Sequence, residues 1–363
     1  MITKRIENNL QFVKLHTYRK NCNCNFNISS FIPKKDQCTA YKAEKKKELE
    51  EYNRHLQEKE KSREEKLRDK ELIFEEFVVA CYDLQAVMTI PNGEASTFYY
   101  KSKINCLNFT ICELGIDQTE CHFWDESDGQ RGANEIGTCV LRFLQKKSAE
   151  SILDMDCVFY SDNCCGQQKN EFIIGMYIYA VKNLKFKSIT HKFLIRGHTQ
   201  NEGDAAYSII EKEIRKTKQS CSIYVPAQYV TAIRNSKKCG NPFDVNGLSY
   251  ADFTDIKNLS SVSLKKNVNG EVVKLSDIKV IRIEKTANND IQIFYKTSYF
   301  DNNYKEIALQ RNFQRICDQQ NLKSLYQKKI KISERKKNYI QILINANLIP
   351  QFYHSYYNNI LKE

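Results

Sequence analysis

The sequence predicts an α/β protein whose core is a mixed sheet flanked by helices. Near-continuous apolar runs typical of buried strands, at residues 77–83 and 155–161, alternate with segments of helical periodicity. The chain has 363 residues, of which 41% are hydrophobic. This is enough apolar material for a large core, and it argues against a disordered chain.

The core elements are expected in the order β, β, β, α, β, α, β, α. Strands are expected at residues 77–83, 108–114, 120–124, 155–161 and 190–195. Helices are expected at residues 133–146, 171–183 and 203–216. The second helix is apolar nearly all round, which indicates that it is buried.

Composition divides the chain into five segments. The core at 77–217 is preceded by an irregular, cysteine-containing segment at 1–40 and a long charged helix at 41–76, and is followed by a small β-rich appendage at 218–320 and basic helices at 321–363. The charged helix mixes both signs at i,i+4 spacing without Gly or Pro, so we expect a solvated helix or a weak coiled coil through which the chain forms a homo-oligomer.

The composition also excludes several classes of protein. No apolar run reaches the roughly 18 residues that a membrane span needs, and the N-terminus has no signal-peptide core. The 14 cysteines form no CxxC pair, and the spacing of Cys22, Cys24 and Cys38 fits no standard zinc module. We expect an intracellular, nuclear protein with mostly reduced thiols.

The net charge of +12, from 56 Lys and Arg against 44 Asp and Glu, favours an anionic partner, DNA above all. The alternative explanation is the codon bias of an AT-rich genome, since Asn, Lys, Ile and Tyr are all abundant. A local surplus lies between Lys323 and Lys337, where seven Lys or Arg accompany one Glu. We expect this tail to contact the nucleic-acid backbone.

Four acids lie at positions that indicate chemistry. Asp83 ends the first buried strand and Asp162 follows the fourth, while Glu135 and Asp204 lie in the first turns of two helices. This order matches an RNase H-like fold, in which the first and fourth strands are neighbours and their terminal carboxylates meet. Each acid also has a structural explanation, as a strand-end or helix-start cap.

Such a set suits phosphodiester cleavage. Two Mg²⁺ (or Mn²⁺) ions roughly 4 Å apart activate a water and neutralise the leaving oxygen, and carboxylates are the ligands they prefer. We therefore expect Asp83, Asp162, Asp204 and Glu135 to bind metal, with Glu202 as an alternative third acid. His198, on a Gly-flanked loop, is a candidate proton donor or a loop hydrogen-bonder.

The polar run at 162–170 follows a buried strand directly. It is expected either to shape the site, touching phosphates through Lys169 and Asn170, or to be an ordinary strand-to-helix turn.

Two motifs resemble a metazoan group of transposon-derived proteins. They are Ser161-Asp-Asn-Cys-Cys-Gly-Gln-Gln-Lys-Asn170 and His191-Lys-Phe-Leu-Ile-Arg-Gly-His-Thr-Gln-Asn-Glu-Gly-Asp204, with weaker similarity at 33–38 and 348–353. The resemblance implies an RNase H-like transposase core in which Asp83, Asp162 and Asp204 form the acidic triad. The chain departs from the pattern at Cys165, where Gly is expected, and at Gln168, where Asn is expected.

Three functions remain open on these grounds. The first is a metal-dependent DNA strand-transfer or nuclease core. The second is a domesticated, non-catalytic module that binds nucleic acid or protein. The third is a proofreading-type exonuclease, which is disfavoured because Gln85 stands where that class requires Glu.

Overall fold

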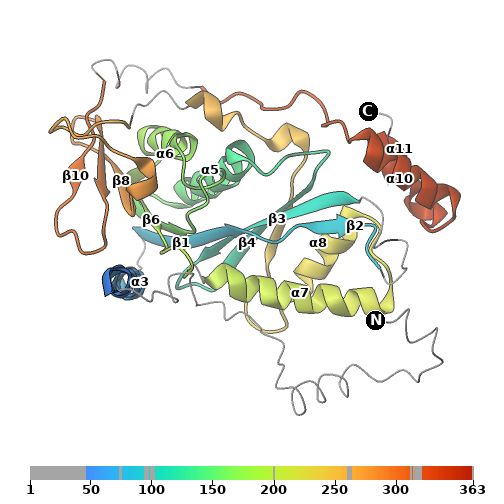
Figure 1. Ribbon diagram of the computed structural model, residues 1–363. Helices are drawn as coiled ribbons and strands as arrows, with labels where there is room; N and C mark the ends of the chain where they lie inside the picture. The colour runs from blue at the N-terminus through green and yellow to red at the C-terminus, as the bar shows by residue number, and fades with distance from the viewer. Residues whose placement is uncertain are drawn as a thin grey trace, which may run out of the picture.

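A ten-stranded mixed sheet runs through the described part of the chain (Figure 1). The computed structural model describes residues 46–72, 76–93, 98, 103–198, 201–259, 264–310, 313 and 321–361. Cys22, Cys24 and Cys38 lie outside the described residues, as does the rest of the segment at 1–40.

The core elements follow the predicted order of strands and helices, with one additional short strand, β2, after the first. The strands are β1 (Phe77–Leu84), β2 (Met88–Ile90), β3 (Ile104–Glu113), β4 (Gln118–Asp125), β5 (Met155–Ser161), β6 (Phe186–Phe193), β7 (Asp244–Gly247), β8 (Val280–Lys285), β9 (Ile291–Lys296) and β10 (Lys305–Glu306). The α-helices are α3 (Lys46–Glu71), α5 (Ala133–Glu150), α6 (Glu171–Asn183), α7 (Glu202–Ser220), α8 (Pro226–Arg234), α10 (Glu334–Asn345) and α11 (His354–Leu361). The predicted α/β class, a mixed sheet with flanking helices, is confirmed.

β1 lies in the middle of the sheet, whose order is β10-β9-β8-β6-β5-β1-β3-β4-β7, with β2 paired to β3. It runs parallel to β5 and antiparallel to β3. β5 in turn runs parallel to β6, and β3 forms a hairpin with β4. The first and fourth strands of the prediction are therefore neighbours.

Helices cover both faces of the sheet. Successive residues of β1 point to opposite faces, and they belong to two separate apolar clusters. Val78, Ala80 and Tyr82 pack with α5 and α6, whereas Val79 and Cys81 pack with α7 and α8. Figure 1 shows α5 and α6 on one side of the sheet and α7 on the other.

The β-rich segment at 218–320 extends this sheet instead of forming a separate appendage. β8 pairs with β6, and β9 and β10 follow it, while β7 pairs with β4 at the other edge. Ile281, Ile283 and Ile293 join the same apolar cluster as α6. Alternation in the sequence reveals which face of a strand is apolar but not which strand it pairs with.

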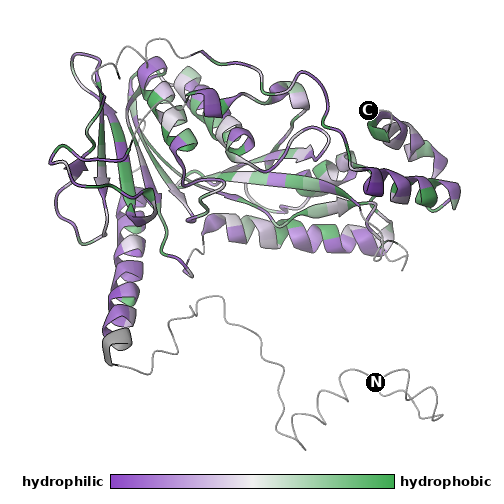
Figure 2. Ribbon diagram, turned by 45° about the horizontal axis from the view of Figure 1, so that its top comes forward, coloured by the Kyte–Doolittle hydropathy of each residue, from purple (hydrophilic) through white to green (hydrophobic). Residues whose placement is uncertain are grey.

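α3 docks one face on the sheet through charged groups, while most of its other residues are exposed, as the sequence predicts. Lys192 of β6 bridges Glu65 and Asp69 at 2.8 Å each, and both of these carboxylates belong to α3. The Tyr160 hydroxyl donates to Asp69 at 2.6 Å. Figure 2 shows α3 coloured mostly as hydrophilic at one end of the sheet, which explains why a search for apolar periodicity misses this contact.

The C-terminal segment is only partly helical. Residues 321–333 carry no α-helix, so the basic cluster lies mostly ahead of α10. Pro350 separates α10 from α11, as predicted. Among the described residues, no helix combines the length and apolar character needed to cross a bilayer.

Candidate active site

Asp83 and Asp162 lie side by side at the ends of two central strands. The parallel pairing of β1 with β5 keeps one offset as far as Cys81 opposite Tyr160. The same offset places Asp162 opposite Asp83. Cys81 and Tyr160, two residues earlier, pack in the apolar cluster that faces α7, so both acids lie on the α7 face.

The first turn of α7 packs onto Asp83. The Tyr207 hydroxyl donates to the main-chain oxygen of Asp83 at 2.5 Å. A β-carbon on Gly203 would lie 3.6 Å from Cβ of Asp83, at ordinary van der Waals distance, so this turn lies beside Asp83. Asp204 follows in the same turn, and its Oδ2 accepts the main-chain N–H of Asn201 at 3.1 Å. α7 thus brings the third predicted aspartate to the end of β1.

The charges of the other two aspartates act on Asp83. Burial, together with the charges of Asp162 and Asp204, raises the pKa of Asp83 from 3.8 to about 7. The main-chain N–H of Leu84, which donates to the carboxylate at 2.8 Å, acts in the opposite direction and lowers this pKa. Burial also raises the pKa of Asp162, opposed by the N–H of Cys164 at 3.0 Å. Crowded carboxyl groups of this kind favour a bound proton or a bound cation.

Two buried amides belong to the same region, and sequence reasoning does not single them out as site residues. The side chains of Gln168 and Asn201 are 1% and 8% exposed. Within the described residues, neither the amide oxygen nor the amide nitrogen of either side chain has a hydrogen-bond partner. Gln168 lies close enough to the Asp83 carboxyl to lower its pKa, although the two side chains do not meet the geometry of a hydrogen bond.

Glu202, the alternative third acid, is engaged by α3. Its carboxylate forms an ion pair with Lys66 and accepts the thiol hydrogen of Cys81 at 3.3 Å. Burial raises the pKa of Glu202, but the ammonium of Lys66 outweighs this effect and lowers it. Because Lys66 neutralises Glu202, Asp204 is the better third acid.

Glu135 is not brought together with the three aspartates. Its carboxylate accepts the main-chain N–H groups of Gln130 and Gly132, both at 3.0 Å, and the hydroxyl hydrogen of Tyr326. It therefore caps the N-terminus of α5. α5 packs on the face of the sheet opposite to α7, so the predicted metal-binding role of Glu135 is replaced by a structural one.

His198 lies against α3. Its ring centroid is 5.2 Å from that of His55, and the side chain is buried. Its main-chain N–H donates to Ile195 at 2.9 Å, across Gly197, which has a φ of 82°. The proposed role of His198 in protonating a leaving group stays a prediction.

Lys169 and Asn170 hold the loop between β5 and α6. The ammonium of Lys169 donates to Asn163 at 3.0 Å and to the main-chain oxygen of Ser276 at 2.9 Å. The Asn170 side chain accepts two main-chain N–H groups at the start of α6, both at 3.1 Å. Both residues are therefore used inside the protein, which matches the structural explanation of this run.

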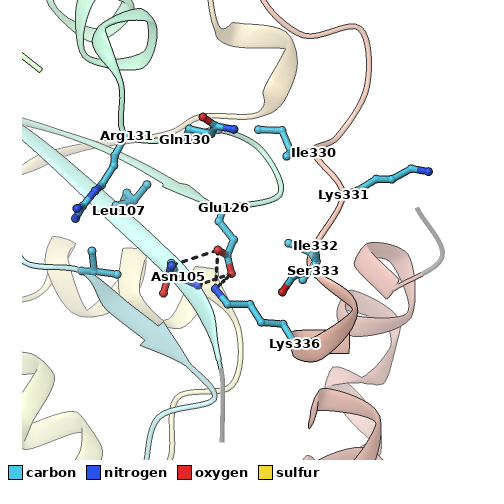
Figure 3. Close-up of a pocket in the computed structure, with 12 residues that line it drawn as sticks. Asn105, Leu107, Glu126, Gln130, Arg131, Ile330, Lys331, Ile332, Ser333 and Lys336 are labelled. Carbon is cyan, nitrogen blue, oxygen red and sulfur yellow. Dashed lines mark hydrogen bonds and ion pairs between the residues drawn. The ribbon is translucent and has the colours of Figure 1, made fainter. Parts of the chain in front are cut away.

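The basic tail lines a pocket of about 400 Å³ between residues 330–336 and the ends of β3 and β4. Some of its cations are paired, Lys336 with Glu126 at 2.6 Å and Lys329 with Asp128 at 3.3 Å. Figure 3 shows the Lys331 side chain pointing away from Glu126. The exposed basic residues of the tail are Lys323, Lys328, Lys331 and Arg335.

The donor set fits a hard divalent cation. In the part of the chain that the structure describes, no three His, Cys, Asp or Glu side chains stand close enough to hold one metal ion among themselves. Mg²⁺, however, is commonly held by only one or two carboxylates and retains several waters. Asp83 and Asp162 would supply the carboxylates, Asp204 a third charge, and the two unpartnered amides further oxygen atoms.

Comparison with known proteins gives one match. Residues 111–301 match the family described as "Domain of unknown function (DUF7869)". No curated protein matches the chain.

Proposed function

Because this chain belongs to the DUF7869 family, whose function is unknown, we propose a function from its own site: divalent-cation-dependent cleavage or strand transfer of DNA, by an RNase H-like core of transposase origin. The observation that carries this proposal is the placement of Asp83 and Asp162 on neighbouring parallel strands, with Asp204 on the helix that packs against them. The sheet order around β1 supports the RNase H-like assignment.

Each residue of the proposed site has its own role in binding the cation. Asp83 and Asp162 would hold the cation from the sheet, and Asp204 would complete the site from α7. Two divalent cations, when bound, supply an activated water and a neutralised leaving oxygen. Tyr207 fixes the main chain at Asp83, so the carboxyl keeps its position when the proton on it is exchanged for a cation.

The exonuclease alternative gains no support from the site. Gln85, at the position where that class needs a carboxylate, is buried, and its amide oxygen accepts a hydrogen bond from Asn108 at 3.0 Å. Gln85 therefore serves the packing between β1 and β3.

The test is nicking of supercoiled plasmid DNA in Mg²⁺ or Mn²⁺. We expect the wild-type chain to nick, Asp162→Asn to lose this activity, and Glu171→Gln, an exposed acid on α6, to keep it. Nicking that survives Asp162→Asn contradicts the site. No nicking by the wild-type chain favours the alternative, a non-catalytic module derived from a transposase that binds nucleic acid or protein.

A further inference from the structure

We propose that the side-chain amides of Gln168 and Asn201 bind the hydrated divalent cation at the Asp83–Asp162 pair. This inference rests on the proposed function and extends it to two residues that belong to no acidic triad. It is carried by their burial, their missing partners and their position beside Asp83.

Gln168 sits in a loop that other residues hold in place. Lys169 ties the loop to Ser276, and Asn170 caps α6. The main-chain N–H of Gln168 donates to Cys164 at 2.9 Å. The side-chain amide of Gln168 has no part in these bonds. A buried amide without a partner is costly, so in a fixed loop it indicates a ligand that provides the partner.

Asn201 approaches the same place from α7. Its main-chain N–H and oxygen both bond to Asp204, while its side-chain amide has no partner among the described residues. A β-carbon on Gly203 would lie 2.8 Å from Oδ1 of Asn201 and 3.6 Å from Cβ of Asp83. The Asn201 amide oxygen and Asp83 thus flank one glycine, on which no larger side chain fits without displacement.

The chemistry favours a cation over an anion at this point. Asp83, Asp162 and Asp204 together repel a phosphate unless a cation lies between them. An amide oxygen is a hard donor of the kind that Mg²⁺ and Mn²⁺ accept, and an amide group also bonds to the waters that Mg²⁺ retains. The amides supply the ligands that three carboxylates do not provide alone.

The test is a titration of the full chain with Mn²⁺. The electron paramagnetic resonance signal of free Mn²⁺ measures how much of the metal is bound. We expect Gln168→Met and Asn201→Ala each to weaken binding about tenfold, the lower range for residues that orient metal ligands. Gln168→Glu, which keeps an oxygen at the same place, should bind at least as tightly as the wild-type chain. Gln167→Ala, in the neighbouring, half-buried position, should bind like the wild-type chain.

Thermal unfolding without metal separates this role from a structural one. Since the Gln168 amide has no hydrogen-bond partner among the described residues, Gln168→Met should keep or raise the melting temperature. Asn201→Ala removes the N-cap residue of α7, so it should lower the melting temperature by an amount that does not depend on metal. Unchanged Mn²⁺ affinity in both variants overturns the inference and leaves the proposed function standing, provided that Asp162→Asn abolishes binding. Absence of Mn²⁺ binding by the wild-type chain instead contradicts the proposed function itself.

Discussion

Asp83 and Asp162 each follow by two residues the last registered pair of β1 and β5, Cys81 opposite Tyr160, and burial raises the pKa of both carboxyl groups. In the absence of a cation, two such groups compete for protons. The stability of the fold should therefore depend on pH through this pair.

Asp83→Asn should stabilise the chain at high pH only. The pKa of Asp83 moves from 3.8 to about 7 on folding, so the folded state binds the proton more tightly. The stability contributed by Asp83 is full below pH 3.8 and is lost as the pH rises through about 7. At pH 8 without divalent cations the variant should gain up to about 4 kcal/mol over the wild-type chain, at about 1.4 kcal/mol per pH unit. At pH 4 the two should differ little.

Urea unfolding at several pH values measures this difference. Titrating groups that do not interact with Asp83 are shared by the two proteins, so their contributions cancel in the comparison, whereas Asp162 and Asp204 interact with Asp83 and form part of the measured difference. A gain that is the same at pH 4 and pH 8 would show that Asp83 does not titrate between these values.

Glu135→Ala should destabilise the fold without affecting cation binding. Its carboxylate accepts two main-chain N–H groups at the start of α5 and the hydroxyl of Tyr326. Removing it leaves part-buried donors without this acceptor, which costs about 1 kcal/mol or more. Chemical unfolding measures the stability of this variant, and Mn²⁺ titration measures its affinity for the cation. Weaker Mn²⁺ binding would show that Glu135 does contribute to the metal site.

Lys192→Met should loosen α3. The ammonium of Lys192 bridges Glu65 and Asp69, and these three side chains are largely buried. Burial lowers the pKa of Lys192, but its two carboxylate partners outweigh this and raise it. Breaking a buried ion pair by removing one partner costs about 3 kcal/mol or more. The amide hydrogens of α3 should then exchange faster.

Lys187→Met is the matched control for α3, because Lys187 belongs to the same strand and its ion pair with Glu76 is exposed. An exposed pair is worth less than about 1 kcal/mol. If the two variants lower stability equally, charge pairing does not hold α3 on the sheet.

The tail should contribute to DNA binding only through its exposed cations. Replacing Lys323, Lys328, Lys331 and Arg335 with Gln should reduce the slope of log affinity against log salt by about 3 to 4, at about 0.9 for each phosphate contact. Lys336→Gln should leave the slope unchanged, since Lys336 pairs with Glu126. Fluorescence anisotropy of labelled duplex DNA measures both slopes, and an unchanged slope in the fourfold variant would remove the tail from the DNA interface.

The sequence is sufficient to predict that Asp83 and Asp162 meet. Both follow buried apolar runs, and parallel neighbouring strands bring their carboxyl ends to one edge of a sheet. The position of Asp204 could also be predicted, because it lies in the first turn of the last helix of the core.

Other features depend on tertiary contacts that no local pattern records. Glu135 begins a helix as Asp204 does, yet its helix packs on the other face of the sheet. The docking of α3 rests on charge pairs that apolar periodicity does not register. Among the described residues the side-chain amides of Gln168 and Asn201 have no hydrogen-bond partner, which depends on the residues that surround them and not on local sequence.

In the proposed site, Asp83 and Asp162 hold a divalent cation between them. The most direct measurement is anomalous X-ray diffraction from crystals of the full chain grown with Mn²⁺. We predict an anomalous peak within coordination distance of both carboxylates, roughly 2 Å from the nearest oxygen atoms, that disappears in Asp162→Asn. Crystals of the wild-type chain with no peak there, or with one that persists in Asp162→Asn, would contradict the claim.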